Sequence, residues 1–444
     1  MIDMTPPTAA SKKKKKKAPN NPWSTPAMQQ YRGFKDAHPE CVLFFRMGDF
    51  YEMFDEDART VSKAIGITLT QRGNGIDMAG VPHHAAEGYM RRMVEQGFRV
   101  AVCEQLQDPA EAKGVVERGV TRIVTPGTLI DESLLVDSQT NLLCALRSDE
   151  TMVHLAVAEI STGLFELHRI ALDRLDDALE RLGIAEAIVG EDEDAMIPII
   201  EHCGISLTKR PAWHFDTSEG NTLLKKQFGV TTLSGFGIEE DDPVVGVAGA
   251  ILDYIGVTQA SSDVLAHLQP PRLQESSHFV ALDATTIRSL EIEQTIRGNS
   301  SKGSLLWVMQ RCHTAMGKRL LRRWLCEPLA NREAIEKRQE IVSVFVDDAT
   351  LRSTIQQSLD HVQDIARIAG RIATGRVTPR DIVALGKSLF RCDTITNELQ
   401  GDALQSYRKT LCTLSSQLKP LAEMITTRCN EIPPSHMRDG GLFV

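Results

Sequence analysis

The periodicity of apolar residues changes once along this 444-residue chain, and that change restricts the folds available to it. Up to about residue 280, short apolar runs typical of strands, such as those at 42–45 and 99–103, alternate with helical patterns. From Ala284 onward, apolar residues recur almost wholly at helical spacing. The sequence therefore predicts a multidomain chain in which α/β domains are followed by an all-α segment.

Two α/β domains are expected before the helical segment. In residues 22–130, a helical pattern at 85–96 ends at Gly97 and separates two strand-like runs, which predicts a compact domain with a mixed sheet. In residues 131–275, strand-like runs at 153–160 and 164–170 flank Ser161-Thr162-Gly163, which is a hairpin signal. A helix at 172–182 and a strand at 187–189 are expected next, and residues 276–444 form the helical segment.

The formal net charge of −9 is distributed unevenly. Residues 131–281 hold 9 Lys and Arg against 26 Asp and Glu, a net charge of −17, so this segment should be repelled by phosphate. Residues 282–444 hold 23 against 18, a net charge of +5, and could contact nucleic acid. Residues 1–21, with a run from Lys12 to Lys17, are expected to be a disordered tail that is either merely solvated or a weak DNA tether.

The composition also excludes several classes of protein. No apolar run is long enough to span a membrane, and the lysine-rich start does not resemble a signal peptide, so neither membrane insertion nor secretion is expected. The nine cysteines lie far apart without a Cys-x-x-Cys pair, which favours a reduced, cytosolic chain. The pairs His83-His84 and His202-Cys203 lack further ligands, so no metal site is expected.

Phe50 and Glu52 are the candidate functional pair. If the backbone is extended there, their side chains project to the same face, one ring to stack and one carboxyl to hydrogen-bond. An apolar wedge of this kind can enter between base steps of DNA and kink the duplex. An isolated Phe-x-Glu would more often be a core ring beside a solvated carboxylate. The surrounding residues therefore decide between this structural interpretation and a DNA-contacting pair.

Those surrounding residues resemble the mismatch-reading motif of the MutS family of DNA mismatch-repair proteins. The motif is FFRMGDFYE at 44–52. Further blocks resemble that family in order: LTQRG at 69–73, MAGVPHH at 78–84, VCEQ at 102–105 with DP at 108–109, VER at 116–118, RIVTPGT at 122–128, LDATT at 282–286, LEI at 290–292 and TAMGKRLLRRWL at 314–325. The resemblance covers nearly everything after the first twenty or so residues.

The resemblance implies a fold and a site. Residues 22–130 correspond to the mismatch-binding domain, 131–275 to a ribonuclease-H-like α/β connector, and 276–444 to the α-helical core and lever. It implies that Phe50 stacks on a mispaired or unpaired base from the minor groove and that Glu52 hydrogen-bonds the same base. The other site residues that it implies are Met47, Gly48, Asp49, Arg72 and Met78, of which Gly48 allows close backbone approach, while Met47, Arg72 and Met78 either line the groove or are structural.

Nucleotide chemistry is not expected from this chain. The family carries a C-terminal ATPase domain with a phosphate loop, and the nearest match here, DIVALGKS at 381–388, has Asp381 in place of the first glycine and lies in a helical pattern. No cofactor is therefore expected, because ATP and magnesium would belong to the missing ATPase domain. Glu159 on a predicted strand invites a nuclease interpretation, but two-metal hydrolysis needs several converging carboxylates.

Two functions remain open at this point. The first is a non-enzymatic sensor of double-stranded DNA with mismatches or small loops. The second is an interaction module that binds repair partners through the connector and helical segment and binds DNA weakly by itself. The resemblance further implies a homodimer, MutL-type partners and a cytoplasmic, nucleoid-associated location.

Overall fold

The computed structural model describes residues 22–73, 75–107, 114–149, 151–259, 265–275, 278–434 and 440–444. The tail expected at 1–21 lies outside these residues. The chain divides into two compact units. One comprises the residues up to Tyr89 together with Val100–Thr121, and the other comprises Met90–Arg99 together with Arg122–Val444.

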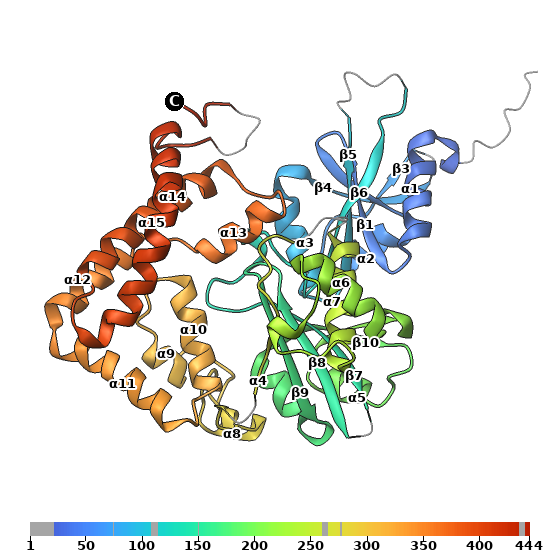
Figure 1. The fold of residues 1–444 in the computed structure, drawn as a ribbon. Coiled ribbons are helices and arrows are strands. Elements are labelled where there is room, and N and C mark those ends of the chain that lie inside the picture. The colour runs from blue at the N-terminus through green and yellow to red at the C-terminus, as the bar shows by residue number, and fades with distance from the viewer. Residues whose placement is uncertain are drawn as a thin grey trace, which may run out of the picture. The chain divides into compact units, whose positions relative to one another are not determined.

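The first α/β region contains a six-stranded sheet in the order β3-β4-β2-β1-β5-β6 (Figure 1). The strands are β1 Cys41–Met47, β2 Phe50–Phe54, β3 Thr70–Arg72, β4 Ile76–Pro82, β5 Arg99–Gln105 and β6 Arg118–Val124. The helical elements are η1 Pro22–Ser24, α1 Pro26–Ala37, α2 Glu56–Ile65, η2 His83–Ala85 and α3 Ala86–Val94. Strands β1, β2, β4 and β3 pair successively in antiparallel fashion.

Hydrogen bonds to Asp57 connect this sheet to helices α1 and α2. The carboxylate, which is almost fully buried on α2, accepts hydrogen bonds from the Tyr31 hydroxyl at 2.7 Å, Lys35 Nζ at 2.7 Å and the Leu43 amide at 3.1 Å. Burial, and then the Asp57 charge, raises the pKa of Tyr31 well above its ordinary value. Helices α1 and α2 are thereby fixed to β1, next to the hairpin that β1 forms with β2.

The second sheet runs in the order β11-β10-β7-β8-β9-β12. Its strands are β7 Leu142–Ser148, β8 Met152–Glu159, β9 Leu164–Ala171, β10 Ile184–Gly190, β11 Ser206–Arg210 and β12 Arg272–Leu273. Strands β7, β8 and β9 form an antiparallel meander, while β10 pairs in parallel with both β7 and β11. Helical elements in and before this region are η3 Glu132–Leu134, η4 Leu172–Arg174, α4 Leu175–Leu182, α5 Ile197–His202, η5 Ala212–Phe215, α6 Thr217–Phe228, η6 Ser234–Phe236 and α7 Pro243–Thr258.

Alternate residues of β7 supply two separate cores. Leu143 and Ala145 pack with α6 and α7, whereas Leu142, Cys144 and Leu146 pack with α4 and α5. Successive side chains of a strand point to opposite faces, so this sheet is covered by helices on both faces. The arrangement agrees with the ribonuclease-H-like connector expected from the sequence.

Glu186 on β10 is the buried polar centre of the connector. One carboxylate oxygen accepts from the Thr208 hydroxyl at 2.7 Å and the Tyr254 hydroxyl at 2.6 Å. The other accepts from the Gly127 amide at 2.9 Å and from the Thr125 hydroxyl. A Cβ atom at Gly127 would lie 2.8 Å from the Glu186 Cβ atom, so only glycine allows this approach.

The remainder of the second unit is helical (Figure 1). Its elements are α8 Ala284–Ser289, α9 Leu305–Met309, α10 Ala315–Cys326, α11 Arg332–Asp347, α12 Ala349–Leu359, α13 Ile365–Ala373, α14 Pro379–Glu398, η8 Asp402–Leu404 and α15 Gln405–Arg428. The predicted fold class, mixed α/β sheets followed by an all-α part, is confirmed. In the part of the chain that the structure describes, no helix has the length and apolarity needed to cross a membrane.

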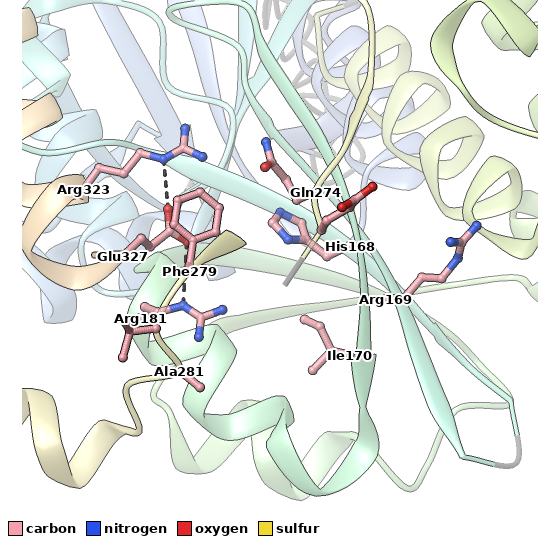
Figure 2. Close-up of a pocket in the computed structure, with 11 residues that line it drawn as sticks. His168, Arg169, Ile170, Arg181, Gln274, Phe279, Ala281, Arg323 and Glu327 are labelled. Atoms are coloured by element: carbon pink, nitrogen blue, oxygen red, sulfur yellow. Dashed lines mark hydrogen bonds and ion pairs between the residues drawn. The ribbon is translucent and has the colours of Figure 1, made fainter. Parts of the chain in front are cut away.

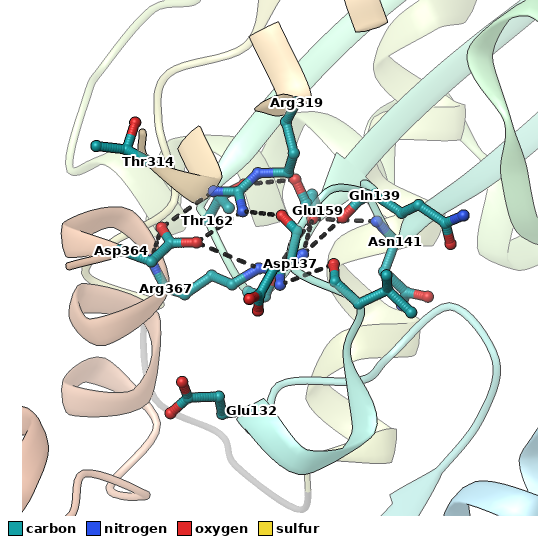
Figure 3. Close-up of polar contacts among 12 residues, drawn as sticks. Glu132, Asp137, Gln139, Asn141, Glu159, Thr162, Thr314, Arg319, Asp364 and Arg367 are labelled. Carbon is teal, nitrogen blue, oxygen red and sulfur yellow. Dashed lines mark hydrogen bonds and ion pairs between the residues drawn. The ribbon is translucent and has the colours of Figure 1, made fainter. Parts of the chain in front are cut away.

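Buried arginines join the helical part to the connector, as Figure 3 shows. Arg367 on α13 donates to the carbonyls of Val136 at 3.1 Å and Gln139 at 2.6 Å. Arg319 on α10 donates to both carboxylate oxygens of Asp364, at 2.6 and 3.0 Å, and to the Asp137 carbonyl. Because these carbonyls belong to the segment that leads into β7, the two regions form one continuous structure.

Candidate functional site

The β1–β2 hairpin carries the predicted site. Its strands pair up to Met47 opposite Phe50, which leaves Gly48 and Asp49 as a two-residue turn. Gly48 has φ +60°, the backbone conformation that a two-residue hairpin turn of type II′ requires at its first position. The glycine therefore sets the hairpin geometry and places Phe50 directly after the turn.

The strand register brings the predicted side chains to one face. Residues directly opposite in an antiparallel pair project to the same side, and so do residues two apart in a strand. Phe50 lies opposite Pro82 and Glu52 opposite Gly80, which has no side chain to cover the carboxylate. The register then places the following predicted residues on one face: Met47, Phe50, Glu52, Arg72 and Met78. Gly48 and the exposed Asp49 form the turn at its edge.

Phe50 differs from the other phenylalanines of the hairpin. Its side chain is 48 % exposed, whereas Phe44, Phe45 and Phe54 are at most 1 % exposed. Burial of a phenylalanine stabilises a protein by roughly 1.5–3 kcal/mol, so leaving this ring in solvent forgoes that stabilisation. The ring is available for a partner outside the chain.

Glu52 is half-buried beside two arginines. Arg72 Nη1 donates to Glu52 Oε2 at 3.0 Å. Burial raises the pKa of Glu52 above its ordinary value, while the charges of Arg72 and Arg118 act in the opposite direction. The carboxyl is therefore more easily protonated than a solvated glutamate.

Arg118 is a member of this site that sequence reasoning did not select. Its guanidinium donates to the Arg46 carbonyl at 2.8 Å and to Gln30 Oε1 at 3.1 Å, and its Cζ atom lies 4.9 Å from the centre of the Phe45 ring. Burial lowers the pKa of Arg118. The only signal in the sequence was its place in the VER block at 116–118.

Metal chemistry finds no support in the described residues, among which no group of three His, Cys, Asp or Glu side chains could hold an ion. Glu159, the residue that invited a nuclease interpretation, is buried and accepts hydrogen bonds from Asn141, Ser161 and Thr162. Its carboxylate is used in holding the end of β8.

The near match to a phosphate loop is helical. Residues 381–388 lie within α14, where Asp381 forms a capping box with Thr378 and pairs with Arg371. Lys387 lies 3.8 Å from Glu431 in an exposed ion pair. A phosphate loop needs successive backbone amides turned toward the ligand, and these amides are already used within a helix.

The fold and the site define a chain with three parts: a mixed-sheet domain that presents an aromatic ring and a carboxylate, a ribonuclease-H-like connector, and a helical domain. Family models match each part: MutS domain I at residues 25–133, MutS domain II at 141–269 and MutS domain III at 285–444. A relative described as "DNA mismatch repair protein MutS", from Alkaliphilus oremlandii (strain OhILAs), is 35 % identical over 433 residues, which is 94 % of this chain and 49 % of the relative. The chain belongs to the MutS family.

The chain spans about half the length of the curated relative that it matches. The matched ranges describe the order of the three parts, and the domain boundaries given from the sequence remain predictions.

Proposed function

We propose that this chain binds double-stranded DNA at mispaired or unpaired bases, with Phe50 as the stacking wedge and Glu52 as the hydrogen-bonding partner. The observation that carries the proposal is the pairing of a half-exposed ring with a carboxyl on the same face, two residues apart on β2. Family membership supports the same function. The roles of Met47, Gly48, Asp49, Arg72 and Met78 are part of the proposal.

Mismatched DNA favours this wedge for an energetic reason. Inserting an apolar side chain unstacks a base step at a cost of about a few kcal/mol, and the duplex must also bend. A mispaired or unpaired base is already poorly stacked, so the cost is lower there. Phe50 supplies stacking that does not depend on base identity, whereas Glu52 selects a base that can offer it a hydrogen bond.

Arg72 makes the carboxyl compatible with a DNA groove. A bare carboxylate would be repelled by nearby phosphates, but the Arg72 guanidinium lies 3.0 Å from Glu52 and balances its charge. Arg72 is 40 % exposed, so it also remains within reach of a phosphate. Glu52 is therefore expected to determine discrimination rather than to add affinity.

The proposal is tested by measuring how tightly the purified chain binds two duplexes that differ only in one unpaired base. We expect a duplex with one unpaired thymine to bind about tenfold more tightly than the fully paired duplex, equivalent to about 1.4 kcal/mol. Equal and weak affinity for both duplexes would favour the second function, an interaction module for repair partners that binds DNA poorly by itself.

The raised pKa of Glu52 predicts a pH dependence of mismatch binding. Because the pKa lies above its ordinary value, the neutral carboxyl becomes populated as pH falls toward it, and this form donates a hydrogen bond and does not repel phosphate. Affinity for the unpaired-thymine duplex should therefore rise as pH is lowered from about 8 to about 5. Fluorescence anisotropy at several pH values measures this.

The matched variant for this pH test is Glu52→Gln, which keeps the side-chain shape and cannot titrate. It should bind with little pH dependence over the same range, and thymine itself gains no proton there. A pH response of equal size in Glu52→Gln would show that another group titrates and that Glu52 is not the source of the pH dependence.

We also propose that this chain neither binds nor hydrolyses ATP and needs no cofactor of its own, ATP and magnesium belonging to the ATPase domain of the family. The support is the helical state of residues 381–388. A purified preparation should show no turnover of ATP above background and no binding of a fluorescent ATP analogue. Turnover of ATP that disappears in Lys387→Ala but persists in Phe50→Ala, a control variant altered only at the proposed DNA-binding site, would contradict this proposal.

From its membership of the MutS family we also propose that this chain forms a homodimer and binds MutL-type repair partners. We propose in addition that it is cytoplasmic and associated with the nucleoid.

A further inference from the structure

A small cavity lies in the second unit, between the connector and the helical part (Figure 2). Its volume is about 80 Å³, and it is lined by residues of β9, α4 and α10, by Glu327 directly after α10, and by residues 274–275 and 279–281. Backbone hydrogen bonds fix residues 278–280, because Val280 donates to the Pro328 carbonyl at 2.8 Å and Ala330 donates to the His278 carbonyl at 2.9 Å. The cavity therefore has an ordered wall on the side of residues 278–280.

Two buried nitrogen atoms of the lining have no hydrogen-bond partner among the described residues. They are Nε2 of His168, a residue that is 8 % exposed, and Nε of Arg181. The closest paired carboxylate oxygens lie too far away for hydrogen bonds, Glu166 Oε2 at 4.0 Å from His168 and Glu327 Oε1 at 3.7 Å from Arg181. Leaving a buried polar atom unpaired costs about 1–3 kcal/mol, so both atoms would gain from a partner in the cavity.

The nearby carboxylates are already used by another arginine. Arg323 donates to Glu327 at 2.9 Å and to both oxygens of Glu166, at 2.9 and 3.1 Å. Gln274 also donates to Glu166 at 2.8 Å. Arg181 is consequently the arginine of this cluster whose charge is least closely compensated.

The unpaired atoms define the chemistry of a ligand. Arg181 Nε can only donate, so the ligand must present an acceptor to it. Burial, reinforced by the charges of Arg181 and Arg323, lowers the pKa of His168 to about 3, so the imidazole is neutral and can donate from Nε2 in one tautomer. Ile170 and Phe279 contribute apolar surface to the same cavity.

We propose that this cavity binds a small aliphatic monocarboxylate. Its carboxylate oxygens accept from Arg181 Nε and His168 Nε2, and its alkyl group packs against Ile170 and Phe279. The volume excludes a nucleotide. A phosphate dianion carries twice the charge of a monocarboxylate beside Glu275 and Glu327, and it has more acceptor oxygens than Arg181 Nε and His168 Nε2 can satisfy. This binding site is independent of the proposed recognition of DNA.

Isobutyrate is the probe that tests the site, and isobutyramide is its neutral counterpart of equal size. Saturation-transfer NMR and thermal shift on the whole chain should show saturable binding of isobutyrate. A charge-assisted hydrogen bond is worth about 1.5–3 kcal/mol, so isobutyramide should bind at least roughly tenfold more weakly. Inorganic phosphate should not compete. Equal binding of the amide would show that Arg181 and His168 do not select a carboxylate, and no saturable binding of isobutyrate would show that the cavity does not take this ligand; either result would overturn the proposal.

Three variants locate the binding. Arg181→Gln removes the charged donor and should weaken isobutyrate binding at least roughly tenfold. Ala281→Leu adds bulk at an exposed position of the lining, leaves both donors intact and should block entry without unfolding the chain. Arg332→Gln, at an arginine whose side chain is 88 % exposed on α11, makes the same chemical change elsewhere and should leave binding unchanged. Undiminished binding in Ala281→Leu would place the ligand at another site and refute the assignment.

Discussion

Replacing Phe50 with alanine should abolish the preference for mismatched DNA while the protein remains folded. The ring makes little contribution to the core, so the free energy of unfolding should change by no more than about 0.5 kcal/mol. Stacking of a base on an aromatic side chain is worth about 1–3 kcal/mol, which corresponds to a loss of roughly 5- to 150-fold in affinity for the mismatched duplex. Anisotropy titrations on matched and mismatched duplexes, with thermal unfolding of the same samples, measure both quantities.

A second exposed phenylalanine provides the matched control for this prediction. Phe390 on α14 is 55 % exposed, and Phe390→Ala should alter neither stability nor discrimination. If Phe50→Ala instead lowers the melting temperature by several degrees and keeps the preference for mismatched DNA, Phe50 belongs to the core and the proposal that it acts as a stacking wedge is wrong.

Replacing Glu186 with leucine should destabilise the second unit by about 3–5 kcal/mol, because this carboxylate is fully buried and accepts hydrogen bonds from four donors. Leucine has a similar volume but no acceptor. The Gly127 amide, which cannot turn elsewhere, would lose its acceptor, and so would the hydroxyl groups of Thr125, Thr208 and Tyr254. Chemical denaturation followed by circular dichroism measures the change in the free energy of unfolding.

Two further variants separate charge from hydrogen bonding at this position. Glu186→Gln should cost less than Glu186→Leu, because the hydroxyls of Thr208 and Tyr254 can rotate and accept from an amide. Glu191→Gln, at an exposed position that follows β10, should cost almost nothing. Equal stability of Glu186→Leu and the unmodified chain would show that the buried donors find other acceptors.

The shared face of Phe50 and Glu52 could be predicted from the sequence, given an extended backbone, because the information is local. The turn at Gly48-Asp49 was not predicted. Met47, Gly48, Phe50 and Glu52 lie within six residues, and a short turn with period-two alternation decides which side chains share a face. The strand-like runs at 153–160 and 164–170 were confirmed as β8 and β9 for the same reason. Patterns of this kind need no knowledge of what packs against them.

The buried polar centres could not be predicted, because their partners come from distant segments. Glu186 meets Thr125 and Gly127 across about sixty residues, and nothing in the local sequence distinguishes it from a solvated glutamate. Helical periodicity also overestimated the packed faces. Val342 and Ile372 lie in the segment where apolar residues recur at helical spacing, yet they are 53 % and 45 % exposed, because the described neighbouring helices cover only part of each apolar stripe.

The two-residue turn at Gly48-Asp49 limits how this hairpin can be altered without loss of its geometry. Side chains on a strand alternate with a period of two, so a change in loop length that shifts the β1–β2 register by one residue would turn the ring and the carboxyl to the opposite side of the sheet. Substitutions leave the register intact, whereas a longer or shorter loop requires a different turn geometry. A combinatorial library for new lesion specificities should therefore vary residue identities at constant loop length, so that every member presents the same face.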